Sequence, residues 1–257
     1  MKCRPVNLLF IVNSLGFGGA EKHVITLLNN LDSAQFRLSL AYLKDDGTLL
    51  PQLDFKVVEG GIFHCKATRK IDQRVIKQLA THINQEEVDI VVCTNTYSLL
   101  YGWLARLRSG RQPRMVEVFH STELESIKDS LQMLIYRPLI LACHKLVYVC
   151  QNQRSYWRAR ALRARQDAVI HNGIDVDYFV DHYSGQEKTL LRQTYGFSAD
   201  DYVIGLCAAM RPEKAHGDLL DAIVRLRAGG LCAKALLIGD GPERSKIEKK
   251  NPGPGVD

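Results

Sequence analysis

The 257-residue chain lacks the cysteine spacing of a zinc site or a disulfide framework, because no two cysteines are spaced Cys-x-x-Cys and their number, seven, is odd. Several lie in apolar runs such as "DIVVCT" and "LVYVC", which predicts buried thiols in a reducing compartment. The seven are Cys3, Cys65, Cys93, Cys143, Cys150, Cys207 and Cys232.

A membrane-spanning segment is also missing. The longest apolar region, "LQMLIYRPLILACHKLVYVC", is interrupted by the pairs Arg137–Pro138 and His144–Lys145 and cannot supply the roughly 20 apolar residues that a spanning helix needs. The N-terminal "MKCRPVNLLFIVNSLGFGGA" is similar to a signal peptide, but its short apolar core breaks at Asn13, as a strand running into a loop does. We expect a cytoplasmic protein, with peripheral contact to the inner face of the cell membrane left open.

The composition is that of a globular protein, with 46% apolar and 24% charged residues. The net charge of +6 is compatible with an anionic ligand, a membrane surface or nucleic acid. Nucleic acid fits less well, because no nucleic-acid-binding motif accompanies the charge.

Strand and helix patterns alternate along the chain, which predicts a parallel α/β sheet with crossover helices. We expect strands at Val6–Asn13, Phe36–Leu43, Phe55–Val58, Ile62–Cys65, Val88–Thr94, Arg114–Phe119, Leu146–Cys150 and Ala168–Ile170. We expect helices at Ala20–Leu31, Ile71–Asn84, Tyr97–Arg108, Leu124–Ala142 (kinked or divided at Pro138) and Gln151–Ala164.

A second α/β unit follows a turn-rich segment, "HNGIDVDYFVDHYSGQE". We expect strands at Tyr202–Cys207 and Ala233–Ile238, and helices at Lys214–Arg227 and from Pro242 to Lys250. The predicted organisation is a complete domain over 1–175, a linker over 176–200 and a partial second domain over 201–257. Two parallel strands leave sheet edges exposed, so we expect the second domain to be truncated or to lean on a partner.

The segment "GFGGAEKHV" (Gly16 to Val24) places three glycines in four positions between a strand and a helix. Gly16 and Gly18 fit the dinucleotide fingerprint Gly-x-Gly-x-x-Gly, but Glu21 stands where the third glycine packs a helix against its strand. These residues alone leave two alternatives equally open. One is a tight turn with Glu21 complementing the helix N-terminus, and the other is a loop approached closely by a ligand.

Four segments, taken in order, favour the ligand-binding alternative for the glycine loop: "GGAEKHVITL", "AVIHNGID", "MRPEKAHGDLLDAI" and "LLIGDGPER". In their order and separation they resemble the family 4 glycosyltransferases. The resemblance covers nearly the whole chain and implies a GT-B-like fold of two Rossmann-like domains, the second partial here. It implies transfer of a sugar, with retention, from a nucleoside diphosphate sugar to a glycan or lipid-linked acceptor in cell-envelope polysaccharide biosynthesis. It implies no metal ion or other cofactor.

The resemblance also implies donor-binding residues. Arg211 and Lys214 of "RPEK" are the cations expected to hold the diphosphate, although a solvated helix start is the alternative. Many family members carry the arginine five residues before the lysine, where this chain has Ala209. A strand ends just before "RPEK", and α/β sheets bind ligands at such places.

Two pairs of glycines complete the expected donor site. Gly18 and Gly19 are expected at the ligand, and Gly239 and Gly241 form a turn expected near the nucleotide. For the second pair, a tight strand-to-helix turn explains the glycines almost equally well.

Polar residues at two predicted strand ends are expected to line the acceptor side. The family usually carries a histidine where His120 stands, so we expect His120 in the cleft, positioning polar groups rather than acting as a general base. Asn95 and Thr96 suit a polyhydroxy acceptor, but capping of the following helix is slightly favoured for them.

The segment "NQRSYWRARALRARQ" contains five arginines, two aromatic residues and no acid. Such a run is usually a solvated face, and it also suits an anionic membrane surface. The resemblance raises the membrane interpretation, because acceptors in this family are often lipid-linked. The arginines are Arg154, Arg158, Arg160, Arg163 and Arg165.

The family carries a Glu-x7-Glu motif further along its second domain, and the chain ends before that place. We therefore expect an incomplete donor site and little or no turnover by these 257 residues. Two other functions stay open: a non-catalytic module that binds acceptor or membrane, and a nucleotide-sugar epimerase of the same fold.

Overall fold

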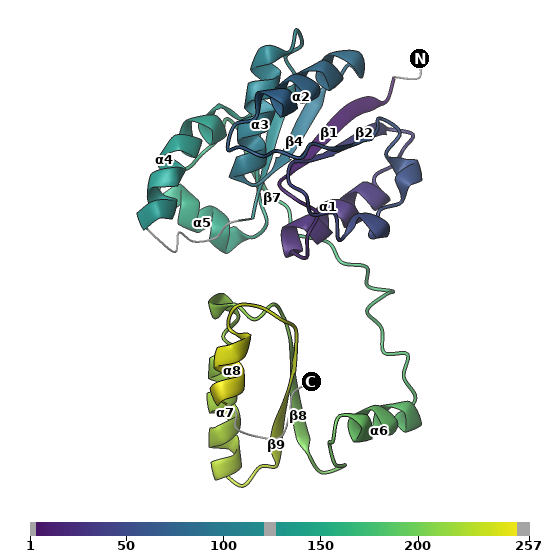
Figure 1. Cartoon of the computed structure of the whole chain (residues 1–257), viewed down its shortest axis with the longest axis vertical. Coiled ribbons are helices and arrows are strands. Elements are labelled where there is room, and N and C mark those ends of the chain that lie inside the picture. The colour runs from purple at the N-terminus through teal and green to yellow at the C-terminus, as the bar shows by residue number, and fades with distance from the viewer. Residues whose placement is uncertain (1–3, 121–126, 251–257) are drawn as a thin grey trace. The chain divides into compact units, whose positions relative to one another are not determined.

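The structure is a computed structural model that describes residues 4–120 and 127–250, and the chain divides into two compact units (Figure 1). Unit 1 is Met1–Asp175 and unit 2 is Val176–Asp257. Each unit is described by itself below.

Unit 1 is built on a seven-stranded, all-parallel sheet in the order β3-β2-β1-β4-β5-β6-β7. The order reverses between β1 and β4, as in Rossmann-like sheets, and confirms the predicted fold class. The strands are β1 (Val6–Val12), β2 (Phe36–Tyr42), β3 (Ile62–His64), β4 (Ile90–Thr94), β5 (Arg114–Phe119), β6 (Lys145–Tyr148) and β7 (Asp167–Val169).

The central strands are continuously apolar because both faces of the sheet are covered. Along β1, Leu9 and Ile11 enter one core, while Phe10 and Val12 enter the other. Phe10 pairs in register with Leu40 of β2 and with Val92 of β4.

Helix α1 (Gly19–Asn30) covers one face of this sheet, and four helices cover the other (Figure 1). Val24, Ile25 and Leu28 of α1 pack into the core that contains Phe10 and Val12. The four helices on the second face are α2 (Gln73–Gln85), α3 (Thr96–Arg108), α4 (Ile127–Ala142) and α5 (Gln151–Ala159).

Two local predictions in unit 1 are wrong. The segment predicted as a strand at 55–58 is a short 3₁₀ helix, Phe55–Val57, because the Asp54 side chain accepts the backbone N–H of Lys56 and caps a turn. Of the two alternatives predicted at Pro138, a kink or a division, the division is wrong, because α4 continues through this residue. Pro138 and Leu134 are both exposed, so water can reach the carbonyl that loses its helical partner. The predicted start of this helix, 124–126, lies outside the described residues.

Unit 2 holds a parallel pair, β8 (Tyr202–Cys207) and β9 (Ala233–Ile238). Its helices are α6 (Gly185–Thr194), α7 (His216–Ala228) and α8 (Arg244–Lys250). A small buried core gathers Met210, Leu220 and Ile247. These elements match the partial second Rossmann-like domain that the sequence predicts.

Helix α6 falls inside the predicted linker, which is therefore not irregular throughout. Ser184 and Glu187 form a capping box: the Ser184 side chain accepts the Glu187 N–H, and the Glu187 carboxylate accepts the Ser184 N–H. The linker prediction missed this start signal within "HYSGQE" because the segment lacks an apolar period.

The prediction of buried thiols holds for three cysteines of unit 1, but Cys150 of "LVYVC" is only half-buried and the prediction fails in unit 2. Cys3 lies outside the described residues. Cys65, Cys93 and Cys143 are buried. Cys207 and Cys232 are exposed, because a two-stranded sheet leaves much of its surface uncovered. Within the described ranges, no helix has the length and apolar character needed to cross a membrane.

Candidate functional site

The polar residues predicted for unit 1 lie at the carboxyl edge of its sheet. Asn95 follows β4 and His120 follows β5, and these two strands are direct neighbours. The glycine loop follows β1, the neighbour of β4 on its other side. Parallel strands end at the same edge, so the topology brings these segments together.

Asn95 and His120 are joined by a hydrogen bond. The Asn95 Oδ1 atom accepts the backbone N–H of His120 at 3.1 Å. Asn95 has φ of 68° and ψ of 164°, a backbone region that is nearly restricted to glycine, so the residue is held in a strained conformation. Asn95 holds the N-cap position of α3, but its side chain makes no capping hydrogen bond. The capping interpretation is therefore wrong for Asn95. Thr96 is the first residue of α3 and is half-buried.

A second histidine, His23 of α1, lies against His120. The two rings meet edge to face with centroids 5.7 Å apart. His120 Nε2, His23 Nδ1 and the Oδ1 of Asn13 are all buried, and none has a hydrogen-bond partner in the structure. The site thus presents three unsatisfied polar atoms, which a polyhydroxy ligand could satisfy.

Both histidines are held neutral. Burial, with a smaller contribution from the charge on His23, lowers the pKa of His120 to about 4. Burial also lowers the pKa of His23. A neutral imidazole with so low a pKa suits hydrogen bonding to a hydroxyl better than proton abstraction near pH 7.

Gln153, which the sequence analysis missed, fixes the end of β5 from the other side. Its side chain is fully buried, and its Nε2 donates to the Phe119 carbonyl at 2.7 Å. Its Oε1 accepts the Val149 N–H at 2.8 Å. The strand end that carries His120 is therefore held by Asn95 and by Gln153. His23 was also missed, although its place one turn after Gly19 in "GAEKH" offered a signal.

The glycine loop does not need glycine for its backbone conformation. Gly18 is extended, with φ of −159°, and neither Gly18 nor Gly19 has a positive φ. A Cβ at Gly18 would lie 2.1 Å from the Glu21 Oε2, so this carboxylate folds back over the loop. A Cβ at Gly19 would meet nothing within 4 Å. Gly19 thus leaves open space at the start of α1, where a ligand could approach the backbone.

Arg211 and Lys214 lie together at the carboxyl edge of the unit 2 sheet. Lys214 ends a 3₁₀ turn, Pro212–Lys214, that Arg211 precedes, and the Lys214 N–H donates to the Arg211 carbonyl at 3.0 Å. Both side chains are exposed, and neither forms an ion pair with another described residue. Ala215, with φ of 54°, then turns the chain into α7.

Gly239 and Gly241 are required by close backbone packing. Their φ values are 147° and 154°. A Cβ at Gly239 would lie 2.0 Å from the Ala208 carbonyl oxygen, and one at Gly241 would lie 2.6 Å from that of Met210. The Met210 N–H donates to the Asp240 carbonyl at 2.9 Å. The two loops are thereby joined beside Arg211.

A profile of Glycosyltransferase Family 4 matches residues 17–178, well over half of the chain. The chain belongs to this family. The match includes the glycine loop, Asn95 and His120.

Three similar proteins show how closely this chain resembles known sequences and structures. EpsF of Bacillus subtilis (strain 168), whose name describes it as a glycosyltransferase, is 24% identical over 97% of this chain and 66% of its own length. Alpha-monoglucosyldiacylglycerol synthase of Acholeplasma laidlawii is 27% identical over 35% of this chain and 24% of its own length. The solved structure of Anabaena HepE with UDP has a TM-score of 0.74 at 19% identity, over 95% of this chain and 64% of that chain. The chain thus spans about two thirds of EpsF and HepE.

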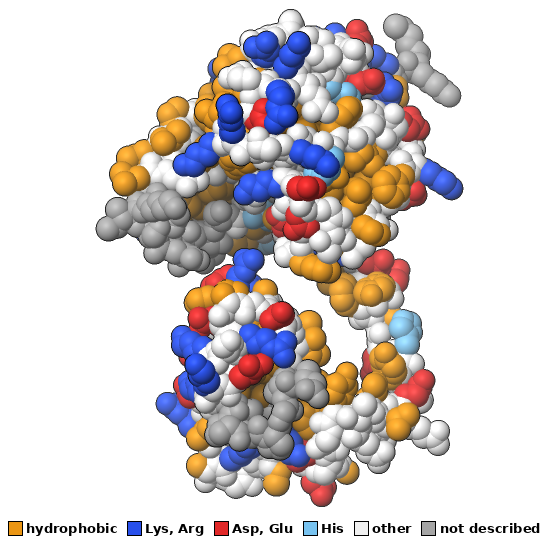
Figure 2. All heavy atoms as spheres, viewed as in Figure 1, with side chains coloured by type: hydrophobic (Ala, Val, Ile, Leu, Met, Phe, Trp, Pro, Cys, Tyr) orange, Lys and Arg blue, Asp and Glu red, His pale blue; other side chains and the backbone are white. Residues whose placement is uncertain are grey.

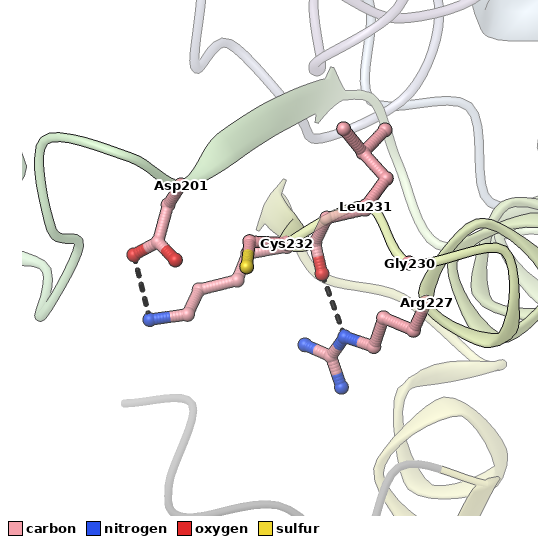
Figure 3. Close-up of a pocket in the computed structure, with 7 residues that line it drawn as sticks. Asp201, Arg227, Gly230, Leu231 and Cys232 are labelled. Carbon is pink, nitrogen blue, oxygen red and sulfur yellow. Dashed lines mark hydrogen bonds and ion pairs between the residues drawn. The ribbon is translucent and has the colours of Figure 1, made fainter.

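A cavity of about 370 Å³ in this family 4 chain lies away from the expected donor residues (Figure 3). It opens at the amino ends of β8 and β9, opposite the edge that carries Arg211. Asp201 and Lys234 form an ion pair of 2.7 Å there, and Arg227 Nε donates to the Ala233 carbonyl at 2.6 Å. Ligands of α/β sheets bind at the carboxyl edge, so we do not assign this cavity to the donor.

The arginine run predicted as a cationic surface is partly neutralised. Arg154 and Arg158 both pair with Asp167, at 2.6 and 2.8 Å. Burial alone would raise the pKa of Asp167, but hydrogen bonds from Arg158 and Arg154 prevail and lower it. Arg160 stacks on the Tyr156 ring at 3.6 Å.

Proposed function

We propose that the protein transfers a sugar, with retention, from a nucleoside diphosphate sugar to a hydroxyl of a glycan or lipid-linked acceptor. The observation that carries this proposal is the carboxyl edge of unit 2. Arg211 and Lys214 offer two exposed cations there, beside a glycine turn, and neither pairs with an acid among the described residues. Solved structures of HepE with UDP and with UDP-glucose support a diphosphate donor for a chain of this fold.

In this proposal the leaving diphosphate is stabilised by charge rather than by a metal ion. Lys214 and Arg211 supply charge-assisted hydrogen bonds to its oxygens as the bond to the sugar breaks. Positioning supplies much of the rest of the rate, because transfer joins two bound molecules. We expect chelators to leave the rate unchanged.

His120 orients a sugar hydroxyl in unit 1. Its low pKa keeps the ring neutral, so Nε2 can accept or donate a hydrogen bond according to the tautomer. Asn95 is a positioning residue, because its side chain holds the backbone of His120. Gly18 and Gly19 leave room for the sugar or the diphosphate, and Thr96 offers a hydroxyl to the acceptor.

We propose a role in cell-envelope polysaccharide biosynthesis, on the cytoplasmic side of the membrane. The name of the Acholeplasma relative, a synthase of a glucosylated diacylglycerol, supports a lipid-linked acceptor. The family match favours transfer over the epimerase alternative. An assay with donor but no acceptor separates the two, because only an epimerase converts the free nucleotide sugar to its epimer.

Calorimetric titration of UDP and UDP-glucose into the protein tests the donor site. We expect Lys214→Ala to weaken binding about tenfold or more, since a hydrogen-bonded charge on a phosphate contributes roughly 1.5–3 kcal/mol. Lys246→Ala is the matched control: Lys246 is an exposed lysine of the same unit, paired with Glu243 at 2.9 Å. Equal affinity of the two variants would refute the assignment of Lys214.

A further inference from the structure

Helix α4 carries an apolar stripe that faces solvent. Leu131, Leu134 and Ile135 are 60%, 60% and 70% exposed, and Leu141 is 43% exposed. With exposed Pro138 between them, they follow helical spacing along one side of the helix. Figure 2 shows hydrophobic side chains gathered over this part of unit 1. A contiguous exposed apolar patch of this kind marks an interaction site more often than scattered apolar residues do.

The opposite side of α4 packs into the core of unit 1. Tyr136 and Ile140 are buried, and Ile140 belongs to the core on this face of the sheet. The Leu139 carbonyl accepts the Trp103 Nε1–H of α3 at 3.1 Å. Helix α4 is thus held by its inner face, and its outer stripe is not needed for packing within unit 1.

Cations border the stripe. Arg137 lies one turn from Leu134 and from Leu141, and its guanidinium donates to the Arg160 carbonyl at the end of α5. Arg163 and Arg165, which follow α5, are exposed and form no ion pair with any described residue. The stripe therefore runs beside the part of the arginine run that Asp167 does not neutralise.

The same cationic margin continues along the amino edge of the sheet. Arg114 begins β5 and Lys145 begins β6, and both are exposed. Arg165 comes two residues before β7, the neighbour of β6. Arg114 and Arg165 are both close enough to His144 to lower its pKa, after the larger effect of burial. Helix α4 ends three residues before Lys145, so its apolar stripe leads directly into this margin.

We propose that the α4 stripe (Leu131, Leu134, Ile135, Leu141) and the adjoining cations Arg137, Arg163 and Arg165 form a docking surface for an anionic lipid bilayer. The apolar side chains enter the boundary between headgroups and acyl chains, and the cations bind the anionic headgroups. Charge complementarity selects this occupant. An identical second copy would bring the same cations together, and their repulsion would oppose a dimer through this surface.

The surface adjoins the expected acceptor edge. Helix α4 begins at Ile127, seven residues after His120, and runs toward the amino edge of the sheet. A bilayer along this helix could present a lipid-linked acceptor near His120. Only this delivery of a lipid-linked acceptor rests on the proposed function. Docking itself needs no turnover, so vesicle binding and UDP binding fail or succeed independently.

Co-sedimentation with vesicles tests the proposal. The purified 257-residue protein is expected to bind mixed phosphatidylcholine–phosphatidylglycerol vesicles, and not pure phosphatidylcholine vesicles. Salt should release it, because surface attraction is screened within about 10 Å at 0.1 M. The double variant Leu134→Glu/Ile135→Glu should weaken binding at least about tenfold. Arg163→Gln/Arg165→Gln should weaken it roughly fivefold per arginine.

Two controls match these variants. Phe55→Glu alters a residue of 57% exposure in the short 3₁₀ helix of unit 1, away from α4, and should leave binding within about twofold. Arg158→Gln removes an arginine that pairs with Asp167, and should also leave binding within about twofold. Circular dichroism melts verify that every variant folds.

Three results would overturn the proposal. The first is equal binding to both vesicle types, and the second is wild-type binding by the Leu134→Glu/Ile135→Glu variant. The third is a protein that ignores vesicles but forms a dimer in light scattering that Leu134→Glu dissociates, which would assign the stripe to a second copy.

Discussion

The side-chain Oδ1 of Asn95 lies 3.1 Å from the backbone nitrogen of His120 and accepts its hydrogen bond. The Asn95 N–H in turn donates to the Val118 carbonyl at 3.2 Å. The residue after β4 therefore extends the pairing of β4 with β5 by one step beyond the strands. This contact fixes the position of the His120 backbone, and therefore the position at which the His120 ring meets His23.

Replacing Asn95 should separate its two contributions. Asn95→Ala keeps the Cβ that wild type already holds at φ of 68° but loses the acceptor, so we expect the free energy of unfolding to fall by about 1–2 kcal/mol. Asn95→Gly also loses the acceptor but removes the Cβ from a backbone region that favours glycine, so its loss of stability should be about 1 kcal/mol smaller. Asn95→Asp keeps an acceptor and should stay closest to wild type. Urea denaturation of the three variants measures these differences. Equal stability of Asn95→Ala and wild type would show that the hydrogen bond contributes nothing.

His23 should tune the protonation of His120. In His23→Phe the edge-to-face contact can persist while the neighbouring positive charge is lost, so the pKa of His120 should rise from about 4. It should stay below 6.5, because burial is the larger cause of the shift. A pH titration of the imidazole signals by NMR measures the change.

The same pair predicts a pH dependence of stability. Both histidines have folded-state pKa values below the unfolded value of 6.5, so the unfolded state binds more protons in this range. Stability should therefore be fully present above pH 6.5 and fall as the pH drops toward 4, by at most about 1.4 kcal/mol per pH unit for each histidine. His23→Phe should flatten this acid limb. If His23→Phe lost stability between pH 6.5 and pH 4 as steeply as wild type, groups other than this histidine would cause the loss.

Two glycines should respond in opposite ways. Gly19→Val should leave the thermal melt unchanged, because a Cβ there meets nothing within 4 Å, while turnover of the whole protein should fall about 100-fold if ligand passes the loop. Gly239→Ala should destabilise unit 2 by about 3 kcal/mol or more, since the Cβ would lie 2.0 Å from a carbonyl oxygen at φ of 147°. Calorimetry with a transfer assay measures both. Full activity of Gly19→Val would place the loop outside the site.

The sequence predicted the sheet elements of unit 1 well because their apolar runs are long and end in clear turn signals. The predicted and observed bounds of β5, Arg114–Phe119, are the same. The 3₁₀ turn at Phe55 and the helix at Gly185 were missed because capping by Asp54 and by Ser184 decides them, not a period.

The site was predicted less completely, because its organising contacts are long-range. Asn95 binds a backbone 25 residues away, and Gln153 binds one 34 residues away. Both contacts depend on strand order and register, which no local pattern encodes. The sequence pointed to His120 only through the family resemblance, and the roles of the predicted donor and acceptor residues stay predictions.

Glu117 is the least expected residue of unit 1. It occupies the middle of β5, in register with Cys93 of β4, and is fully buried. Neither carboxylate oxygen has a hydrogen-bond partner in the structure. Burial raises the pKa of this carboxyl well above its usual value, so the group folds as the neutral acid. In the alternating burial of β5, Glu117 shares the buried face with Met115 and Phe119.

Replacing Glu117 with leucine should therefore stabilise the protein, and the gain should grow with pH. The folded state keeps a proton that the unfolded state releases above about pH 4.5, so wild-type stability falls as the pH rises from there through the folded-state pKa. The difference in unfolding free energy between Glu117→Leu and wild type should widen by up to about 1.4 kcal/mol per pH unit over that window. Near pH 4 this difference should hardly change with pH. Urea denaturation at pH 4, 6 and 8 measures it, with Glu59→Leu, at an exposed position, as a control whose difference from wild type should stay constant. A pH-independent gap for Glu117→Leu would mean that the buried carboxyl finds a partner when it ionises.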